Sequence, residues 1–453
     1  MKNLSKNQIL KSSVLDLTSQ GEGVVKIDHF PIFVEGALPG ETIEFKIVKL
    51  GKKFGYGRLL KIIQASPHRV EAKDDVGRQI GTMTLQHLEY SEQLKFKQKL
   101  VKDAFERIGK FSQLTIHPTI GMEKPWEYRN KAQIPVRQIN NQLETGFFRK
   151  NSHDLIPIEN YYIQHPVIDQ TILTVRNILR QLHISAYNEE SHTGLVRHII
   201  VKRGHYTEEI MVVFVLNGKK MLHEQALVQA MVDQIPHLVS IVANFQTKET
   251  NVIMGRENSV LWGQAFYEDE MLGLRFKISA QSFYQVNTPQ AERLYQTAID
   301  YAQLSGTETV LDAYCGIGSI SLALAQSAKQ VYAMEVVAEA IAMAKENARL
   351  NQIENVSFEV GKAEDVLPNW QKEGIHFDVA VVDPPRKGLD QQFIQTLTEL
   401  APQRIVYVSC NPATCARDCR LIADAGYTID EIQPVDLFGQ TVHTEVVVKL
   451  SQP

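Results

Sequence analysis

The chain has 453 residues, of which 44% are hydrophobic and 22% are charged, a balance typical of soluble globular proteins. It has no run of eighteen apolar residues and no apolar segment near its N-terminus, which argues against a transmembrane helix and a signal peptide, so we expect a cytoplasmic protein. Its four cysteines all lie in the last third of the chain and do not resemble a secreted disulfide framework.

The first 65 residues carry a surplus of positive charge on an otherwise acidic chain. They hold ten Lys or Arg and six Asp or Glu, whereas the net charge of the whole chain is −4, so the remainder carries −8. Short apolar runs separated by Gly and Pro in residues 11–65 predict a small β-barrel of the oligonucleotide-binding type. Residues 51–58 interleave cations with aromatics, which suits RNA contact; an ordinary hairpin turn and a chance charge imbalance stay open as alternatives.

The middle of the chain, residues 66–280, is expected to form an α+β domain without a catalytic motif. Residues 89–110 predict an amphipathic helix. Four lysines of this helix are expected to form a solvated basic face, with RNA contact as the alternative: Lys95, Lys97, Lys99 and Lys102. Two basic clusters, residues 128–131 and 148–150, are candidates for phosphate contact.

From about residue 290, strands and helices alternate regularly, which predicts a doubly wound parallel sheet. The first strand, residues 309–312, leads into a Gly-containing turn, and the second, residues 330–334, ends in Glu335. An acidic residue 23 positions after Asp312, at the end of the second strand, is typical of a site that binds ribose hydroxyls. The turn lacks the third glycine of the dinucleotide fingerprint, which disfavours a pyrophosphate ligand.

Two later strands of this sheet also end in reactive side chains. Residues 377–382 run into Asp383, and residues 405–408 run into Cys410. Because the carboxyl ends of parallel strands meet at one edge of a sheet, Glu335, Asp383 and Cys410 are expected to converge on one crevice. A cysteine beside a helix N-terminus can have a lowered thiol pKa and act as a nucleophile; a buried structural thiol is the alternative.

In their order and spacing, five motifs together resemble those of the RNA 5-methyluridine methyltransferases that use S-adenosylmethionine. The motifs are Ser282-Phe283-Tyr284-Gln285-Val286-Asn287, Asp312-Ala313-Tyr314-Cys315-Gly316-Ile317-Gly318, Asp383-Pro384-Pro385-Arg386-Lys387-Gly388, Ser409-Cys410-Asn411-Pro412 and Phe438-Gly439-Gln440-Thr441-Val442-His443-Thr444-Glu445. The resemblance implies an α/β, Rossmann-like methyltransferase domain over residues 281–453. It also extends upstream, where residues 1–65 resemble the RNA-binding, OB-like barrel called TRAM, and residues 66–280 correspond to a central α+β domain.

The resemblance implies a role for each candidate site residue. Four side chains would bind the methyl donor S-adenosylmethionine: Gln285, Tyr314, Glu335 and Asp383. Cys410 would be the nucleophile that adds to uracil C6, and Glu445 the general base that removes the C5 proton, with His443 ranked second as the base. A solvated carboxylate is the alternative for Glu445. Ser319 stands where an Asn often contacts the cofactor, and it is left out of the predicted site.

The family also implies an RNA substrate. We expect 23S ribosomal RNA, because the barrel and central domain together resemble the ribosomal members, whereas the transfer-RNA members are usually shorter; transfer-RNA methylation is the alternative with the same chemistry. Intact Cys410 and Glu445 argue against a non-catalytic RNA-binding scaffold. Arg386 argues against an amino-group methyltransferase, which usually carries an aromatic residue after the two prolines. We expect a monomer without membrane contact.

One departure from the family pattern concerns iron. Many ribosomal members hold an iron–sulfur cluster with cysteines before a Leu-Gln-His and a Gln-His-Pro motif, and both motifs occur here, at residues 85–87 and 164–166. Other residues occupy the ligand positions: Asp74, Ile80, Met83 and Tyr161. No thiolate remains there, so we expect no cluster. A different metal site of Cys410, Cys415 and Cys419 is disfavoured, because a metal-bound nucleophile could not attack.

Overall fold

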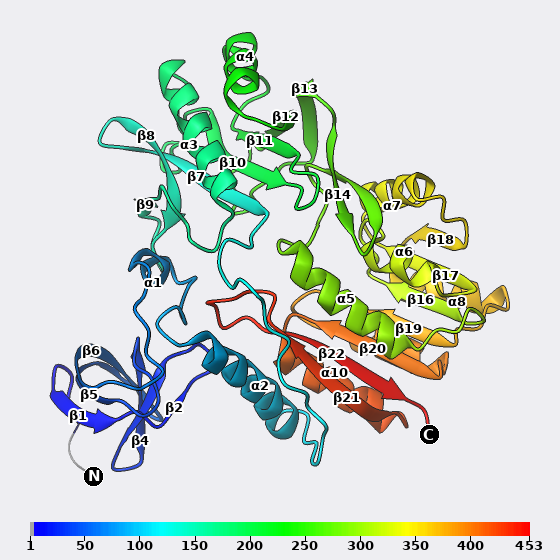
Figure 1. The fold of residues 1–453 in the computed structure, drawn as a ribbon, viewed down its shortest axis with the longest axis horizontal. Coiled ribbons are helices and arrows are strands. Elements are labelled where there is room, and N and C mark those ends of the chain that lie inside the picture. The colour runs from blue at the N-terminus through cyan, green and yellow to red at the C-terminus, as the bar shows by residue number, and fades with distance from the viewer. Residues whose placement is uncertain (1–3) are drawn as a thin grey trace.

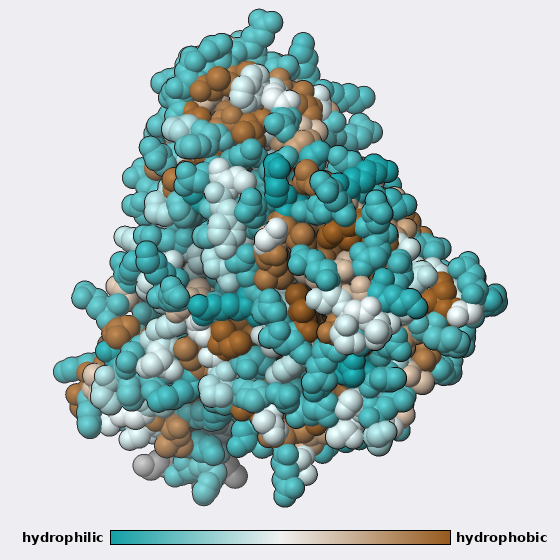
Figure 2. All heavy atoms as spheres, turned by 45° about the vertical axis from the view of Figure 1, so that its right-hand side comes forward, coloured by the Kyte–Doolittle hydropathy of each residue, from teal (hydrophilic) through white to brown (hydrophobic). Residues whose placement is uncertain are grey.

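The structure is a computed structural model that describes residues 4–453. These residues form three sheets and a two-stranded hairpin (Figure 1). In that view the first sheet lies at the lower left, the second at the top and the third at the lower right. The face drawn in Figure 2 is mostly hydrophilic, with hydrophobic residues gathered in a few patches. None of the helices in residues 4–453 has the length and apolar character needed to cross a membrane.

The first sheet has six strands in the order β1-β5-β6-β4-β3-β2. Its strands are β1 (Ile9–Ser13), β2 (Asp16–Leu17), β3 (Gly23–Ile27), β4 (Phe30–Glu35), β5 (Thr42–Leu50) and β6 (Gly55–Gln64). Apolar side chains at alternate positions of β5, such as Ile43, Phe45 and Ile47, point into the core that the sheet encloses. A Cβ at Gly57 of β6 would lie 2.7 Å from the Phe45 side chain, so glycine allows the close packing there.

The second sheet has seven strands in the order β13-β12-β11-β10-β7-β8-β9. Its strands are β7 (Lys131–Ile139), β8 (Gln142–Phe148), β9 (Leu155–Pro157), β10 (Val196–Arg203), β11 (Ile210–Leu216), β12 (Leu238–Phe245) and β13 (Glu257–Gly263). Three helices belong to this part of the chain: α1 (Val76–Ile80), α3 (Pro166–Gln181) and α4 (Glu224–Gln234). Helices α3 and α4 cover the sheet in Figure 1, and every residue of β11 is buried.

The third sheet has the order β18-β17-β16-β19-β20-β22-β21. Its strands are β16 (Thr309–Ala313), β17 (Gln330–Glu335), β18 (Val356–Val360), β19 (Val379–Val382), β20 (Arg404–Ser409), β21 (Thr428–Val435) and β22 (Glu445–Ser451). The helices around it are α5 (Thr288–Ala302), α6 (Ser319–Ala325), α7 (Ala338–Leu350), α8 (Ala363–Lys372), α9 (Gln391–Glu399) and α10 (Pro412–Asp424). The five strands β16 to β20 are parallel, as predicted, whereas β22 pairs antiparallel with both β20 and β21.

Hydrophobic contacts join the second and third sheets into one continuous core. Met211 and Val213 of β11 belong to the same buried cluster as Val310 of β16. The hairpin of β14 (Phe266–Met271) and β15 (Leu274–Ser279) contributes to this cluster between them. The central region therefore packs directly against the sheet that carries the predicted site.

Helix α2 (Tyr90–Arg107) packs against α10 and β21 of the third sheet, although the predicted boundaries place it in the central region. Val101 and Phe105 of α2 lie in the same buried cluster as Ile405 of β20. The predicted solvated face is wrong for Lys97, whose side chain is completely buried. An amphipathic pattern misses this burial because lysine scores as polar even where a buried acid accepts its charge.

The region that corresponds to the iron–sulfur site is filled by apolar side chains. Ile80, Met83 and Tyr161 lie in one small buried cluster, and the Tyr161 ring centroid is 4.7 Å from that of Phe147. Asp74 accepts a hydrogen bond from the backbone N–H of Gly77 at 3.1 Å. Within residues 4–453, no group of three or more His, Cys, Asp or Glu side chains is placed to hold a metal ion. These residues do not fit an iron–sulfur cluster.

From this packing we predict that the central region folds without iron, because apolar contacts occupy the space that a cluster would need. Protein purified without oxygen should be colourless and contain neither iron nor sulfide in stoichiometric amounts. Elemental analysis and the visible absorption spectrum measure this directly. Iron and sulfide in fixed ratio to the protein would contradict the prediction.

Candidate active site

The predicted site residues lie at neighbouring strand ends of the third sheet. Ala313 of β16 pairs with Met334 of β17 on one side and with Val382 of β19 on the other. The residues that follow these pairs are Tyr314, Glu335 and Asp383, so they meet at one edge. Cys410 directly follows β20, the next strand in the sheet. The expected convergence of Glu335, Asp383 and Cys410 is observed.

Glu445 reaches the same edge from the antiparallel strand. Ser409 of β20 pairs with Val446 of β22, so one further step along this register places Cys410 opposite Glu445. Glu445 is the first residue of β22 and only 5% exposed, so it is not a solvated carboxylate. Residues 442–444 belong to the preceding loop.

A cavity of about 1190 Å³ opens at this edge of the sheet. Its lining includes all six residues selected from the sequence: Gln285, Tyr314, Glu335, Asp383, Cys410 and Glu445. Ser319 and His443 line it as well, and Arg129 and Lys131 extend its wall to the second sheet. The cavity therefore joins the predicted cofactor residues, the cysteine and a cationic surface in one space.

The turn after β16 has a backbone conformation that suits a ligand crevice. Tyr314, Gly316 and Gly318 have φ angles of 84°, 55° and 89°, in the region that favours glycine. The N–H groups of Tyr314 and Cys315 both donate to the carbonyl of Met334 at 3.1 Å, which holds the tyrosine in this strained conformation. A Cβ at Gly316 would meet no atom within 4 Å, so its φ angle rather than lack of space calls for glycine. Such strain is concentrated at ligand sites in proteins.

The acidic groups around this turn suit a nucleoside ligand. One oxygen of Glu335 accepts from the N–H groups of Val336 and Val337 at 2.7 and 3.1 Å, and the other has no partner among the described residues. A carboxylate oxygen free at the end of the second strand is positioned to accept ribose hydroxyls. Burial, with the nearby Asp312, raises the pKa of Asp383 to about 7. Such a buried acid gains stability from a cationic ligand.

Cys410 is half-buried, in contrast to the other three cysteines, which are fully buried. Burial and the carboxylates of Glu445 and Asp383 raise the pKa of Cys410 to about 11, while Arg386 acts in the opposite direction. The expectation of a lowered thiol pKa is therefore wrong. Helix α10 does begin at Pro412, as expected, but its N-terminal dipole is outweighed by desolvation and two acidic neighbours.

The two candidate bases differ in their electrostatic environment. Burial and Asp383 raise the pKa of Glu445 to about 8, with Arg386 opposing them. Burial and Arg386 lower the pKa of His443 to about 4, and Arg386 donates to His443 Nδ1 at 2.8 Å. A carboxylate with a raised pKa accepts a proton more readily than an imidazole with a lowered one. These pKa shifts therefore favour Glu445 over His443 as the group that accepts a proton.

The cations that line the cavity include Arg386, to which the sequence analysis gave no place in the site, and Arg129 and Lys131 from a cluster predicted to contact phosphate. Arg386 follows the two prolines of its motif, and its positive charge favours the ionised forms of both Cys410 and Glu445. Arg129 and Lys131 have no ion-pair partner among residues 4–453. Burial and Arg129 lower the pKa of Lys131 to about 8. Unpaired cations in a cavity favour an anionic ligand such as phosphate.

Comparisons with known proteins agree with this geometry. The family model described as tRNA (Uracil-5-)-methyltransferase matches residues 89–453. An uncharacterized RNA methyltransferase from Enterococcus faecalis is 52% identical over 100% of this chain and 99% of its own length. Another from Lactiplantibacillus plantarum is 52% identical over 99% of this chain and 98% of its own length.

A solved structure extends the similarity to the whole fold. The Pyrococcus abyssi tRNA (uracil-54, C5)-methyltransferase, in complex with S-adenosyl-L-homocysteine, has a TM-score of 0.78 and 27% sequence identity. The match covers 97% of this chain and 100% of that one. On these matches and on the geometry of its strand-end site, the chain belongs to the RNA uracil-5-methyltransferase family, with S-adenosylmethionine as its methyl donor.

Proposed function

We propose that this methyltransferase modifies uridine C5 in 23S ribosomal RNA, with Cys410 as the nucleophile and Glu445 as the general base. The observation that supports these roles is the register of β20 and β22, in which Cys410 and Glu445 lie opposite each other inside the cavity. A thiol and a buried carboxylate at one point are the two groups that C5 methylation of uracil needs.

Four residues are proposed to hold the cofactor: Gln285, Tyr314, Glu335 and Asp383. When bound, S-adenosylmethionine supplies an electrophilic methyl group. The unpaired oxygen of Glu335 would accept from ribose hydroxyls, and the amide of Gln285, which donates to the Tyr295 hydroxyl at 3.2 Å, is anchored at the cavity wall. Asp383 lies between this region and Cys410 and would face the cationic end of the cofactor.

In the proposed reaction, Cys410 loses its proton to solvent, and its sulfur forms a bond to uracil C6 as the electrons of the C5–C6 double bond move onto C5 and the C4 carbonyl oxygen. C5 would then take the methyl group as the bond between that group and the sulfonium sulfur breaks, which leaves S-adenosylhomocysteine. Glu445 then accepts the C5 proton, the C5–C6 double bond re-forms, and the bond from C6 to sulfur breaks, which releases the Cys410 thiolate. Arg386 favours the thiolate, because it is the cation that lowers the pKa of Cys410.

Two surfaces are proposed to bind the RNA. Arg129 and Lys131, unpaired in the cavity wall, would contact phosphates next to a uridine that has been unstacked into the site. The first sheet would act as the RNA-binding, TRAM-like barrel. There the Phe33 and Phe54 rings stack with centroids 5.3 Å apart, and Phe54 is 40% exposed beside the exposed lysines 52 and 53. Exposed aromatics beside cations suit base stacking with phosphate contact.

Ribosomal RNA is preferred because residues 85–87 and 164–166 resemble motifs of the ribosomal members. Chain length does not distinguish a ribosomal RNA substrate from a transfer RNA substrate, since the Pyrococcus abyssi tRNA (uracil-54, C5)-methyltransferase is matched over its full length. That match makes transfer RNA the second candidate. Mapping 5-methyluridine in both RNA classes from cells with and without the gene separates them: loss from 23S RNA supports the first proposal, and loss from transfer RNA alone overturns it.

Substitutions of the two catalytic candidates should have different effects. Cys410→Ala should abolish both the covalent RNA adduct and methyl transfer, by about 10³-fold or more, because no thiolate can attack. Glu445→Gln should allow attack and methyl transfer but leave the C5 proton in place. A denaturing gel should then show a protein–RNA band that depends on S-adenosylmethionine and carries its methyl label.

Two comparisons control for this experiment. Cys419→Ala in α10 should retain the adduct and turnover, since Cys419 is buried away from the cavity lining. S-adenosylmethionine binding should survive in Cys410→Ala. If Glu445→Gln turns over normally, Glu445 is not the base and His443 becomes the candidate.

The two chemical steps should depend differently on pH. Because the pKa of Glu445 is raised to about 8, its base form increases with pH up to that value, and adduct decay should rise about tenfold per pH unit below it and then level off. Adduct formation should continue to rise above pH 8, because the pKa of Cys410 is raised to about 11. Rapid-quench single turnovers measure both rates; identical profiles for the two steps would argue against separate roles.

Changes on the first sheet should weaken RNA binding without affecting the cofactor. Lys52→Gln with Lys53→Gln should flatten the dependence of log affinity on log salt concentration by about 0.7–0.9 for each phosphate that the protein no longer neutralises. S-adenosylmethionine affinity serves as the internal control and should not change. An unaltered salt slope would show that this surface does not bind RNA.

A further inference from the structure

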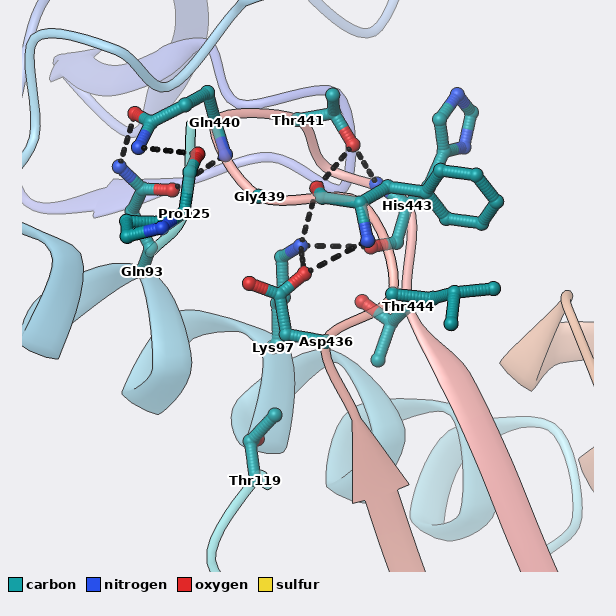
Figure 3. Close-up of polar contacts among 12 residues, drawn as sticks. Gln93, Lys97, Thr119, Pro125, Asp436, Gly439, Gln440, Thr441, His443 and Thr444 are labelled. Atoms are coloured by element: carbon teal, nitrogen blue, oxygen red, sulfur yellow. Dashed lines mark hydrogen bonds and ion pairs between the residues drawn. The ribbon is translucent and has the colours of Figure 1, made fainter. Parts of the chain in front are cut away.

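The loop of residues 436–444, which connects β21 to β22 and ends directly before Glu445, is held by helix α2 (Figure 3). The contacts join segments that are far apart in the chain: Lys97 and Asp436 are separated by 339 residues. In Figure 1 this loop extends beyond the edge of the third sheet toward the first residues of α2. Its position relative to the sheet therefore depends on α2 as well as on the strands.

Lys97 is at the centre of these contacts. Its ammonium donates to the carboxylate of Asp436, to the carbonyl of Phe438 at 3.0 Å and to the carbonyl of His443 at 2.8 Å. A lysine ammonium has three N–H donors, so all of them are used. The Lys97 and Asp436 side chains are both completely buried. Burial lowers the pKa of Lys97, while Asp436 and Glu445 act in the opposite direction and favour its charged form.

Asp436, the acid partner of Lys97, is held by further hydrogen bonds. Asp436 also accepts from the hydroxyl of Tyr90, another α2 residue, at 2.7 Å, and from the N–H of Phe438 at 3.1 Å. The Tyr90 hydroxyl in turn accepts from the N–H of Met122 at 2.8 Å. The polar groups at the base of the loop therefore form one connected network, and a movement of Lys97 would disrupt it.

A second α2 residue fixes the tip of the loop. Gln93 donates to the side-chain oxygen of Gln440 at 2.9 Å and accepts from the Gln440 N–H at 3.0 Å. The Gln440 carbonyl accepts from the N–H of Leu85 at 2.9 Å. Thr441 then links the tip to the Lys97 contacts, since its hydroxyl donates to the Phe438 carbonyl and accepts from the His443 N–H at 2.8 and 3.1 Å.

The contact with His443 matters most for the chemistry. The carbonyl that Lys97 binds lies two residues before Glu445, and the side chain of the same His443 accepts from Arg386 at 2.8 Å. An error of about 1 Å in the position of a catalytic group can reduce a rate by about 10²-fold. By binding the His443 carbonyl, Lys97 therefore fixes the start of β22, where Glu445 faces Cys410.

We propose that Lys97 is a positioning residue: through its contacts with Asp436 and the carbonyls of Phe438 and His443, it holds Glu445 where it can remove the C5 proton. This proposal rests on the proposed role of Glu445. Lys97 contacts no reacting atom, so it acts only through the loop and through its charge.

Lys97 also belongs to the set of charges around Glu445. The other groups of this set are Asp383 and Arg386 of the loop after β19, Cys410 after β20, and Tyr295 of α5. Lys97 lowers the pKa of Glu445, as Arg386 does. Removing the charge of Lys97 should therefore raise the pKa of Glu445, so that the base form is reached only at higher pH.

The test is Lys97→Met, whose unbranched side chain fills most of the same space, ends one atom earlier and lacks the charge and the donors. Methylated adduct should decay roughly tenfold to a hundredfold more slowly, and the rising part of its pH profile should move to higher pH. S-adenosylmethionine affinity should stay within about twofold, because no cofactor candidate is touched. Lys95→Met is the matched control, since Lys95 lies on the same helix, is exposed and pairs only with Glu92.

The double variant Lys97→Met with Asp436→Asn separates the loss of the loop contacts from the effect of an unpaired buried charge. If the single variant does not fold, adduct decay is measured in the double variant instead. It leaves no unpaired buried charge but cannot restore the bonds to the Phe438 and His443 carbonyls. Slow adduct decay in this variant, with a melting temperature close to that of the unmodified protein, supports the proposal. Adduct decay and a pH profile like those of the unmodified protein, in either variant, overturn it.

The proposed function can fail separately. If Glu445→Gln accumulates no adduct and turns over normally, the role of Glu445 is wrong. If Glu445→Gln traps the adduct while Lys97→Met resolves it at the normal rate, only the positioning role of Lys97 is wrong.

Discussion

The antiparallel pairing of β22 with β20 is the constraint on which the site depends. A parallel sheet brings only the carboxyl ends of its strands to the ligand-binding edge. The reversed direction of β22 presents the first residue of a strand there instead, which places Glu445 opposite Cys410. A one-residue shift in this pairing would turn Glu445 to the other face of the sheet, so the register and the proposed chemistry are specified together.

The same pairing makes the loop before β22 critical, and this loop is held by buried polar contacts as well as by Leu437 in the hydrophobic core. Removing one partner of a buried ion pair costs about 3–5 kcal/mol, because the other charge is left uncompensated. Loop arrangements that separate Lys97 from Asp436 are therefore unfavourable. Helix α2, which packs on α10 and β21, carries Lys97, so its packing influences the position of His443 and Glu445.

Much of the site could be predicted because strand ends are visible in the sequence. Largely apolar strand-like runs followed by Glu335, Asp383 and Cys410 predict three side chains at one edge, and the structure places them there. The pKa of Cys410 could not be predicted, since its direction depends on Glu445 and Asp383 as spatial neighbours. The burial of Lys97 could not be predicted either, because its acid partner lies 339 residues away and helical periodicity contains only local information.

The central claim is that Cys410 itself bonds to uracil C6 while C5 receives the methyl group. RNA substrate containing 5-fluorouridine tests it most directly, because fluorine cannot leave C5 as a proton does, so the methylated adduct cannot be resolved. After digestion, mass spectrometry should find a methylated fluorouridine attached to the peptide that contains Cys410. An adduct on Cys315, Cys415 or Cys419, or methylated RNA with no protein attached, would contradict the account.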